Sequence, residues 1–229
     1  MQTLIHKDYT VKLFTEDRCR GIVYAVMDSE CAEETWKLLR GRGMALAAVT
    51  GADWNRDLSP WQAPRAFRSG PDFSGGGAAF LDLLTQTLLP LTEARLPDPP
   101  AFRGIAGYSL AGLFALWAVS RMSHFSRAAS VSGSLWYDGF LDYLRGRTIQ
   151  ADFVYLSLGD REKAARNPRL SAVEDCTLQT VDLLRAQGVP VQFELNPGGH
   201  FQDVSVRLAR ALLALGEWDG VCTDSKSLL

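Results

Sequence analysis

Residues 107–117 read GYSLAGLFALW, and this stretch decides the fold class. A short apolar run ends just before Ser109, and a strongly apolar run follows it. Small residues, Gly107 and Ala111, stand two places before and two places after the serine. A tight strand-to-helix turn requires such small neighbours, and it lifts a serine hydroxyl above the end of a sheet. The stretch therefore predicts a strand, a nucleophile elbow and a helix in succession.

Strand and helix patterns alternate on both sides of this elbow. Strands are expected at Val11–Phe14 (an edge strand), Gly21–Met27, Met44–Thr50, Arg103–Tyr108, Ala128–Ser132, Phe153–Leu158 and Val189–Leu195. Helices are expected at Ala32–Arg40 with Ser29 as N-cap, Ala78–Leu96 with a kink or break at Pro90, Leu110–Arg121, Asp138–Arg145, Leu170–Gln187 and Asp203–Leu215. This alternation predicts an α/β fold with a mostly parallel central sheet and helices on both faces. Functional side chains then belong in the loops at the carboxyl ends of the strands, among them the long loop Gly51–Gly77.

Composition excludes several classes of protein. The 229 residues are 47% hydrophobic and carry 24 Lys and Arg against 26 Asp and Glu. These values predict one globular domain over residues 1–229, and the scattered positive charge predicts no nucleic-acid partner. The most apolar stretch, Gly104–Val119, is too short and too interrupted for a membrane span. Nothing in the sequence indicates an oligomeric state.

The four cysteines, Cys19, Cys31, Cys176 and Cys222, form no CxxC pair and no metal-type spacing with histidine. Four cysteines could pair as two disulfides, but we favour four free thiols, and we expect neither a metal ion nor another cofactor. The first residues, MQTLIHKDYTVKLF, do not have the pattern of a signal peptide. We therefore expect a cytoplasmic protein.

The chain has three histidines, His6, His124 and His200. His200 stands in the stretch NPGGHF, between the last predicted strand and the last predicted helix. A hydrolase with a nucleophile elbow places its histidine base there, in the chain order nucleophile, acid, histidine. We expect His200 to be the base and the other two histidines to be structural.

The acid is expected in the turn Gly159-Asp160-Arg161-Glu162, directly after the strand that precedes the His200 strand. Its role is to hold the histidine tautomer and to stabilise the imidazolium. We favour Glu162, three residues past Gly159, and keep Asp160 as the alternative. Asp203 and Asp175 are weaker candidates.

The Leu110 amide, at the start of the helix after Ser109, is expected to form half of an oxyanion hole. Backbone amides at a helix N-terminus are free to donate, and the helix dipole favours negative charge there.

Together these pieces resemble the "putative esterase" family of the α/β-hydrolase superfamily, which includes siderophore trilactone esterases and esterase D-like S-formylglutathione hydrolases. The matching stretches are GYSLAGLFALW at 107–117, SGSLWYDGF at 132–140, YLSLGDREKAARNP at 155–168 and NPGGHF at 196–201. The stretch NRDLSP at 55–60 resembles that family's loop after a core strand.

The resemblance implies a serine carboxylic ester hydrolase of the α/β-hydrolase fold that acts on a small-molecule ester, either siderophore-type or a small acyl ester. Ser109 would be the nucleophile, and the loop after Thr50 would supply the second oxyanion amide at Ala52 or Asp53. Further residues would contact the substrate: Trp54, Arg56, Tyr108 and Trp136. For Trp54 and Trp136, packing in the interior is an equally good reading.

Two other functions remain compatible with the same residues. An acyltransferase uses the same triad with a different acceptor. A non-catalytic binding module can share the fold, because fold does not imply activity. The short chain leaves room for a lid only within Trp54–Gly77.

Overall fold

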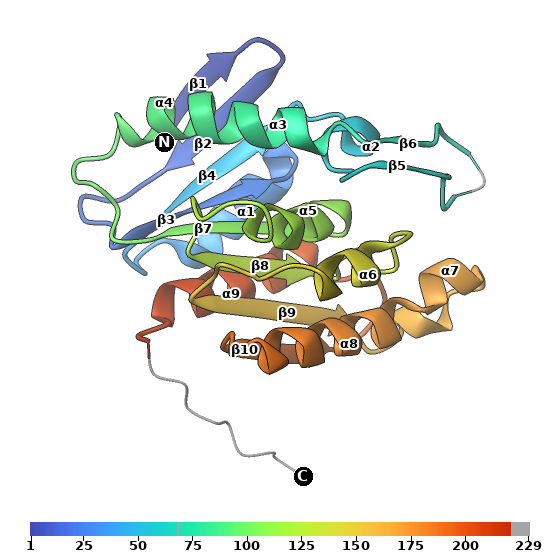
Figure 1. Ribbon diagram of the computed structural model, residues 1–229. Coiled ribbons are helices and arrows are strands. Elements are labelled where there is room, and N and C mark those ends of the chain that lie inside the picture. Colours follow the sequence, from blue (N-terminus) through green and yellow to red (C-terminus); the bar gives the residue numbers. More distant parts are fainter. Residues whose placement is uncertain (68, 221–229) are drawn as a thin grey trace.

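The computed structural model describes residues 1–67 and 69–220. Within them, eight strands form one sheet in the order β1-β2-β4-β3-β7-β8-β9-β10 (Figure 1). The strands are β1 (Gln2–His6), β2 (Tyr9–Phe14), β3 (Gly21–Val26), β4 (Met44–Thr50), β7 (Arg103–Tyr108), β8 (Arg127–Val131), β9 (Phe153–Gly159) and β10 (Val191–Asn196). The pairs β1–β2 and β2–β4 are antiparallel, and all other neighbours are parallel. The predicted mostly parallel sheet is confirmed.

The connections between the strands are mostly helical. They are α1 (Ser29–Leu39), α2 (Trp54–Asp57), α3 (Gly77–Leu83), the π-helix η1 (Leu84–Leu88), α4 (Leu89–Glu93), α5 (Leu110–Val119), α6 (Phe140–Arg145), the 3₁₀-helix η2 (Glu162–Ala164), α7 (Pro168–Ser171), α8 (Val173–Ala186) and α9 (Val204–Glu217). A small hairpin, β5 (Gln62–Ala63) with β6 (Phe73–Ser74), stands beside α7 at the end of the sheet toward which the β8 and β9 arrows point (Figure 1).

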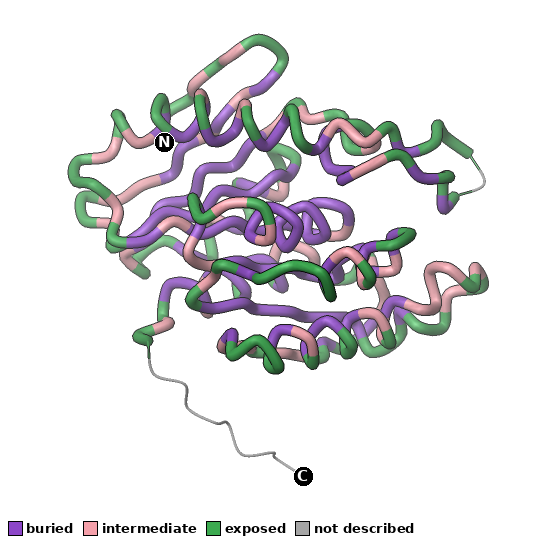
Figure 2. The backbone as a smooth tube through the Cα atoms, viewed as in Figure 1, coloured by how far each residue is buried: buried purple, intermediate pink, exposed green. Residues whose placement is uncertain are grey.

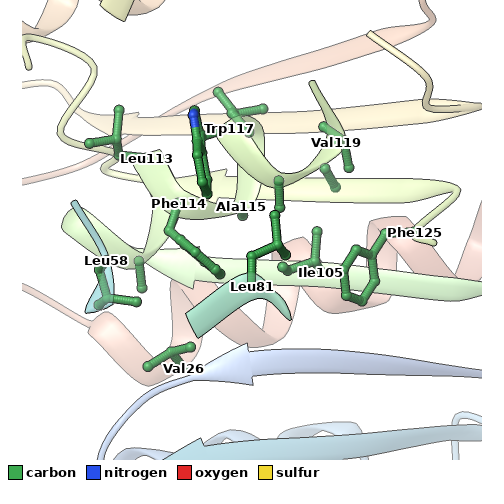
Figure 3. Packing of buried hydrophobic residues seen from close by; sticks show 14 of the residues in the cluster. Val26, Leu58, Leu81, Ile105, Leu113, Phe114, Ala115, Trp117, Val119 and Phe125 are labelled. Carbon is green, nitrogen blue, oxygen red and sulfur yellow. The ribbon is translucent and has the colours of Figure 1, made fainter. Parts of the chain in front are cut away.

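Two apolar layers cover the two faces of the sheet. Helices α1 and α9 cover one face, and α3, α5 and α8 cover the other. The central strands are buried along nearly their whole length (Figure 2). On the α5 face, Phe114, Leu81 and Ile105 meet in one patch (Figure 3). Successive side chains of a strand point to opposite faces, so Ile105 of β7 belongs to the α5 layer and Ala106 to the α9 layer.

Several predicted boundaries are wrong for physical reasons. The segment Val11–Phe14 is not an edge strand, because β1 pairs outside it. Strand β1 is mostly exposed and lacks the apolar run that marks a buried strand. Asp28, and not Ser29, caps α1, since its carboxylate accepts the Cys31 amide at 2.7 Å.

The other helices follow the prediction with two differences. At Pro90 the helical residues continue without interruption from Gly77 to Glu93, and what changes is the type of helix: the π-helix η1 directly precedes α4, which contains this proline. The predicted helix Leu170–Gln187 is in fact α7 and α8, which meet at Ala172. Helix α7 begins early because the Asn167 side chain accepts the Arg169 amide as an N-cap.

Among the described residues, no helix combines the length and the apolar character that crossing a membrane would require. Cys19, Cys31 and Cys176 carry free thiols. Cys222 lies outside the described residues.

Candidate active site

Ser109 stands on the sharp turn between β7 and α5. Its backbone has φ 57° and ψ −119°, a region that residues other than glycine rarely adopt. A Cβ atom on Gly107 would lie 2.3 Å from the Ala111 carbonyl carbon, so glycine is required there. The expected crowding around the elbow is therefore confirmed.

The Leu110 amide begins α5 beside the Ser109 hydroxyl. In the described part of the chain this amide has no hydrogen-bond acceptor, as is usual in the first turn of a helix. The geometry leaves it free for a negatively charged oxygen.

His200 follows β10 and reaches back over the elbow. Its Nε2 lies 3.1 Å from the Ser109 Oγ. The loop that carries it contains Gly198 at φ 103°, a value that glycine adopts without strain. The Tyr108 hydroxyl donates to the His200 carbonyl at 2.5 Å and ties this loop to the elbow.

Glu162 lies on the far side of the imidazole, with Oε2 2.7 Å from His200 Nδ1. Its Oε1 accepts the Ser132 hydroxyl at 2.7 Å and the Gly159 amide at 2.8 Å. Burial by itself would raise the pKa of the Glu162 carboxyl, but these hydrogen bonds from His200, Ser132 and Gly159 outweigh it and hold the pKa below its ordinary value. The carboxylate is therefore charged at neutral pH.

Asp160, the alternative acid, has a different partner. Its Oδ1 accepts the Gly198 amide at 2.8 Å, and its side chain is 53% exposed. It does not contact His200, and neither do the weaker candidates Asp203 and Asp175. The structure brings Ser109, His200 and Glu162 together and leaves these three aspartates out.

Arg207 of α9 is a part of the site that the sequence analysis missed. The side chain is 2% exposed, and its Nη1 lies 3.5 Å from Glu162 Oε1. The guanidinium also donates to the Tyr108 hydroxyl at 3.3 Å, the Ser132 hydroxyl at 3.4 Å and the Pro197 carbonyl at 2.8 Å. One signal was present in the sequence, because helical spacing puts this charge on the apolar face of α9.

Ser134 was also missed. Its Oγ lies 3.3 Å from the Ser109 Oγ, and its amide donates to the Ser109 carbonyl at 3.0 Å. It follows β8 in the stretch quoted for the family resemblance, so its place near the elbow was readable only as part of that resemblance.

The second oxyanion donor was predicted at Ala52 or Asp53, in the loop after β4. The Asp53 amide donates to the buried Asp57 carboxylate at 2.9 Å. Neither Ala52 nor Asp53 lines a cavity that Ser109 borders. In this sheet, β3 lies directly beside β7, the strand that leads to the elbow. In α/β-hydrolases the second oxyanion amide comes from the loop between the neighbouring strand and the helix that follows it. Here that loop is Met27–Ser29.

Two cavities border Ser109. The first, which we name the α7–α8 cavity, has a volume of about 190 Å³ and is lined by Ser134, Trp136, Ala165, Leu170 and Val173. The second, the α1–α9 cavity, has about 350 Å³ and is lined by Met27, Asp28, Cys31, Trp54, Tyr108 and Val204. His200, Phe67 and Phe201 border both. Larger clefts of about 580 and 830 Å³ lie near Arg42, away from Ser109.

Of the predicted substrate contacts, Trp54, Tyr108 and Trp136 line these cavities, and Arg56 lines neither. Arg56 is bound to Asp57 through Nε at 2.7 Å and Nη2 at 3.1 Å.

The Cys31 thiol is a second nucleophile on the wall of the α1–α9 cavity. Burial raises the pKa of this thiol, which keeps it protonated at neutral pH. Ser109 is the nucleophile that has a base within hydrogen-bond distance. In residues 1–67 and 69–220, no three His, Cys, Asp or Glu side chains are grouped as metal ligands.

A family model described as "Putative esterase" matches residues 32–204. Among curated proteins, the uncharacterized protein YbbA of Bacillus subtilis (strain 168) is 30% identical over 138 residues, which cover 58% of this chain and 55% of that protein. The match therefore spans about half the length of this curated relative.

Solved structures with the same fold cover nearly the whole chain. The siderophore hydrolase EstA of Aspergillus nidulans has a TM-score of 0.75 at 20% identity, over 94% of this chain and 93% of EstA. An IroE-like serine hydrolase from Shewanella oneidensis has a TM-score of 0.72 at 18% identity, over 90% of this chain and 74% of that one. The α/β-hydrolase fold is confirmed.

Proposed function

Because this chain belongs to the "Putative esterase" family, whose model matches most of its length, we propose that it is a serine hydrolase of carboxylic esters. One observation carries the proposal: a continuous hydrogen-bonded series runs from the Ser109 hydroxyl through His200 to the buried Glu162. A nucleophile, a base and an acid in this arrangement are the groups that acyl transfer to water requires.

In the proposed mechanism, His200 Nε2 takes the Ser109 proton as Oγ attacks the ester carbonyl. The imidazolium that forms is stabilised by the Glu162 carboxylate at Nδ1. His200 then gives the proton to the leaving alcohol, and an acyl-enzyme on Ser109 remains. Water, activated by His200, releases the acid in the second half of the cycle.

The Leu110 amide is proposed as one oxyanion donor. For the second, the sheet order favours the amides of Asp28 and Ser29, which have no acceptor among the described residues, over the Ala52 and Asp53 amides. Removing one such donor typically costs about 3 kcal/mol in the barrier.

Two ester classes are proposed as substrates: a siderophore-type ester, which the name of EstA indicates for that protein, and a small acyl ester.

We propose that the protein is located in the cytoplasm. The three described thiols are free, which is usual in a reducing compartment. Fractionation of cells that express a tagged chain tests this location.

Labelling with a fluorophosphonate probe tests the hydrolase itself. We expect the wild-type protein to be labelled on Ser109 and Ser109→Ala to remain unlabelled, because the probe needs an activated serine. Ser123→Ala is the matched control and should keep the label, since Ser123 is exposed and lines neither cavity. A folded wild-type protein that reacts no faster than Ser109→Ala would contradict the proposal.

A further inference from the structure

The size of the α7–α8 cavity limits what can lie there. Its volume is about 190 Å³. An engineered apolar cavity of about 150 Å³ holds one benzene molecule. The α7–α8 cavity therefore has room inside it for one ring-sized group, or for a short alkyl chain of similar bulk. The α1–α9 cavity, at about 350 Å³, holds a larger group.

The walls of both cavities are largely apolar. Trp136, Leu170 and Val173 line the first, and Val204 and Leu208 contribute to the second. Each cavity has one acidic lining residue, Glu162 and Asp28 respectively. Glu162 is engaged with His200, Ser132 and Gly159, and Asp28 caps α1.

The lining residues that the structure describes offer a negative charge no lysine or arginine as counter-ion. The nearby arginines have other partners: Arg56 is bound to Asp57, and Arg169 pairs with Asp138 at 3.0 Å. A negatively charged substrate group in these cavities would lose part of its hydration without gaining a lysine or arginine as counter-ion, which is costly.

The mouth of the site is apolar as well. Trp54, Phe67 and Phe201 border the α1–α9 cavity and are 41%, 57% and 87% exposed. Gathered exposed aromatic side chains mark a place that binds apolar partners.

We propose that the substrate is an uncharged ester with an apolar group on each side of the scissile carbonyl, one of them no larger than a single ring. The ring-sized group occupies the α7–α8 cavity, and the larger group occupies the α1–α9 cavity. This inference rests on the proposed hydrolase function and deepens it. It selects the small acyl ester and disfavours an iron-loaded catecholate siderophore, because that complex is anionic.

A matched pair of esters tests the charge. Phenyl benzoate and phenyl 4-carboxybenzoate differ by one carboxylate, and each rate is divided by its rate with hydroxide to remove differences in intrinsic reactivity. We expect kcat/KM to be at least about tenfold higher for phenyl benzoate, since a tenfold preference corresponds to a modest desolvation cost. An equal or higher value for the carboxylated ester, or for an iron-loaded catechol trilactone, would overturn the inference.

Two variants test the two cavities separately. Ala165→Phe adds a ring in the α7–α8 cavity, and Val204→Phe adds bulk in the α1–α9 cavity. The readouts are two ratios of kcat/KM, phenyl benzoate over phenyl acetate for the acyl side and 2-naphthyl acetate over phenyl acetate for the alcohol side. We expect each variant to lower one ratio, and the two variants to lower different ratios.

The same substitutions at exposed positions outside the cavities, Ala79→Phe in α3 and Val206→Phe in α9, are the controls and should change neither ratio. If both cavity variants lower the same ratio, or if neither variant lowers either ratio, the inference is overturned.

The hydrolase proposal is tested by a separate measurement. Failure of the wild-type protein both to cleave phenyl acetate and to label with fluorophosphonate would contradict that proposal. Success in both, with the wrong selectivity, would overturn the substrate inference alone.

Discussion

The backbone of Ser109 is strained. A residue with a side chain at φ 57° and ψ −119° is destabilised by about 1–3 kcal/mol relative to an ordinary conformation. The surrounding structure maintains this conformation: the Ser109 amide donates to Val131 at 3.0 Å, and its carbonyl accepts from Gly112, Leu113 and Ser134. The strain turns the hydroxyl toward His200 instead of along β7.

The identity of the acid is tested by two isosteric substitutions. Glu162→Gln keeps the shape but removes the charge that stabilises the imidazolium, so we expect kcat to fall by about 10³- to 10⁴-fold. Asp160→Asn should leave kcat near the wild-type value, because its Oδ1 can still accept the Gly198 amide. Steady-state kinetics with phenyl acetate provide the comparison, and a larger loss for Asp160→Asn would assign the acid to Asp160.

Acid sensitivity follows from the same carboxylate. Because the pKa of Glu162 in the folded state lies below its ordinary value of 4.5, the ionised carboxylate contributes stability above that pH, and this is lost as the pH falls through the folded-state pKa. Ser132→Ala removes one hydrogen bond to the charge. We expect it to lower the free energy of unfolding by about 1.5–3 kcal/mol at neutral pH and by less below pH 4.5.

Urea unfolding at several pH values measures this difference. Ser130→Ala is the control, since the Ser130 hydroxyl is buried on β8, two residues before Ser132, and has no partner in the described part of the chain. Its effect should not change with pH. A Ser132→Ala effect that is equally constant would mean that the hydroxyl does not stabilise the charged form.

Helix α9 connects the parts of the site. It packs against β7, β8 and β9, the strands that lead to the elbow, to Ser132 and to the Gly159 turn. Its one deeply buried charge, Arg207, contacts the carboxylate, the elbow tyrosine and the histidine loop at the Pro197 carbonyl. A helix that otherwise presents leucine and alanine to the sheet thereby fixes the relative positions of three loops.

Arg207→Met should therefore weaken both stability and turnover. Removing one partner of a buried ion pair typically costs about 3–5 kcal/mol. We expect kcat for phenyl acetate to fall while KM stays nearly unchanged, because Arg207 lines neither cavity. Arg207→Lys keeps the charge and should recover part of kcat.

The same substitution at Arg210, three residues on, is the control. Arg210 is half-exposed and pairs with Glu194 at the surface, a contact worth less than about 1 kcal/mol. A rise in KM for Arg207→Met without a loss of kcat would contradict the positioning role. Near-UV circular dichroism shows whether each variant is folded.

Across the whole molecule, the sheet separates two apolar layers that share few side-chain contacts. Ile149 belongs to the layer of α3, α5 and α8, and Leu212 belongs to the layer of α1 and α9. The site lies where both layers end, at the carboxyl edge of β7, β9 and β10. Each layer borders one of the two cavities at Ser109, because α7 and α8 line one and α1 and α9 line the other.

This separation predicts additive losses of stability. Ile149→Val should cost about 0.5–1.5 kcal/mol and Leu212→Ala about 2–5 kcal/mol. The double variant should equal the sum to within about 0.5 kcal/mol. Leu208→Ala with Leu212→Ala, one turn apart in one layer, is the contrasting pair and should deviate from additivity. Urea unfolding of the single and double variants measures these free energies. A double variant of Ile149 and Leu212 that deviates strongly from the sum would contradict two independent layers.

Much of this organisation was readable in the chain. The order of elements, the elbow at Ser109 and the loop of His200 depend on local patterns, namely apolar runs, turn residues and small neighbours of a serine. The boundary errors have a local cause too. Strand β1 was missed because an exposed strand has no apolar run, and the break at Ala172 followed from a cap at Asn167 that competes with the longer helical pattern.

The sequence by itself determined which residues follow each strand. It therefore determined which side chains are available at the carboxyl edge of the sheet. Only the tertiary structure decided between Glu162 and Asp160 as the neighbour of His200, buried Arg207 behind the acid and formed the two cavities that border Ser109. The physical reason is distance along the chain. These contacts join residues that lie 38 to 99 positions apart in the chain. Crossover connections and packing bring such residues together, and local propensity does not encode either of them.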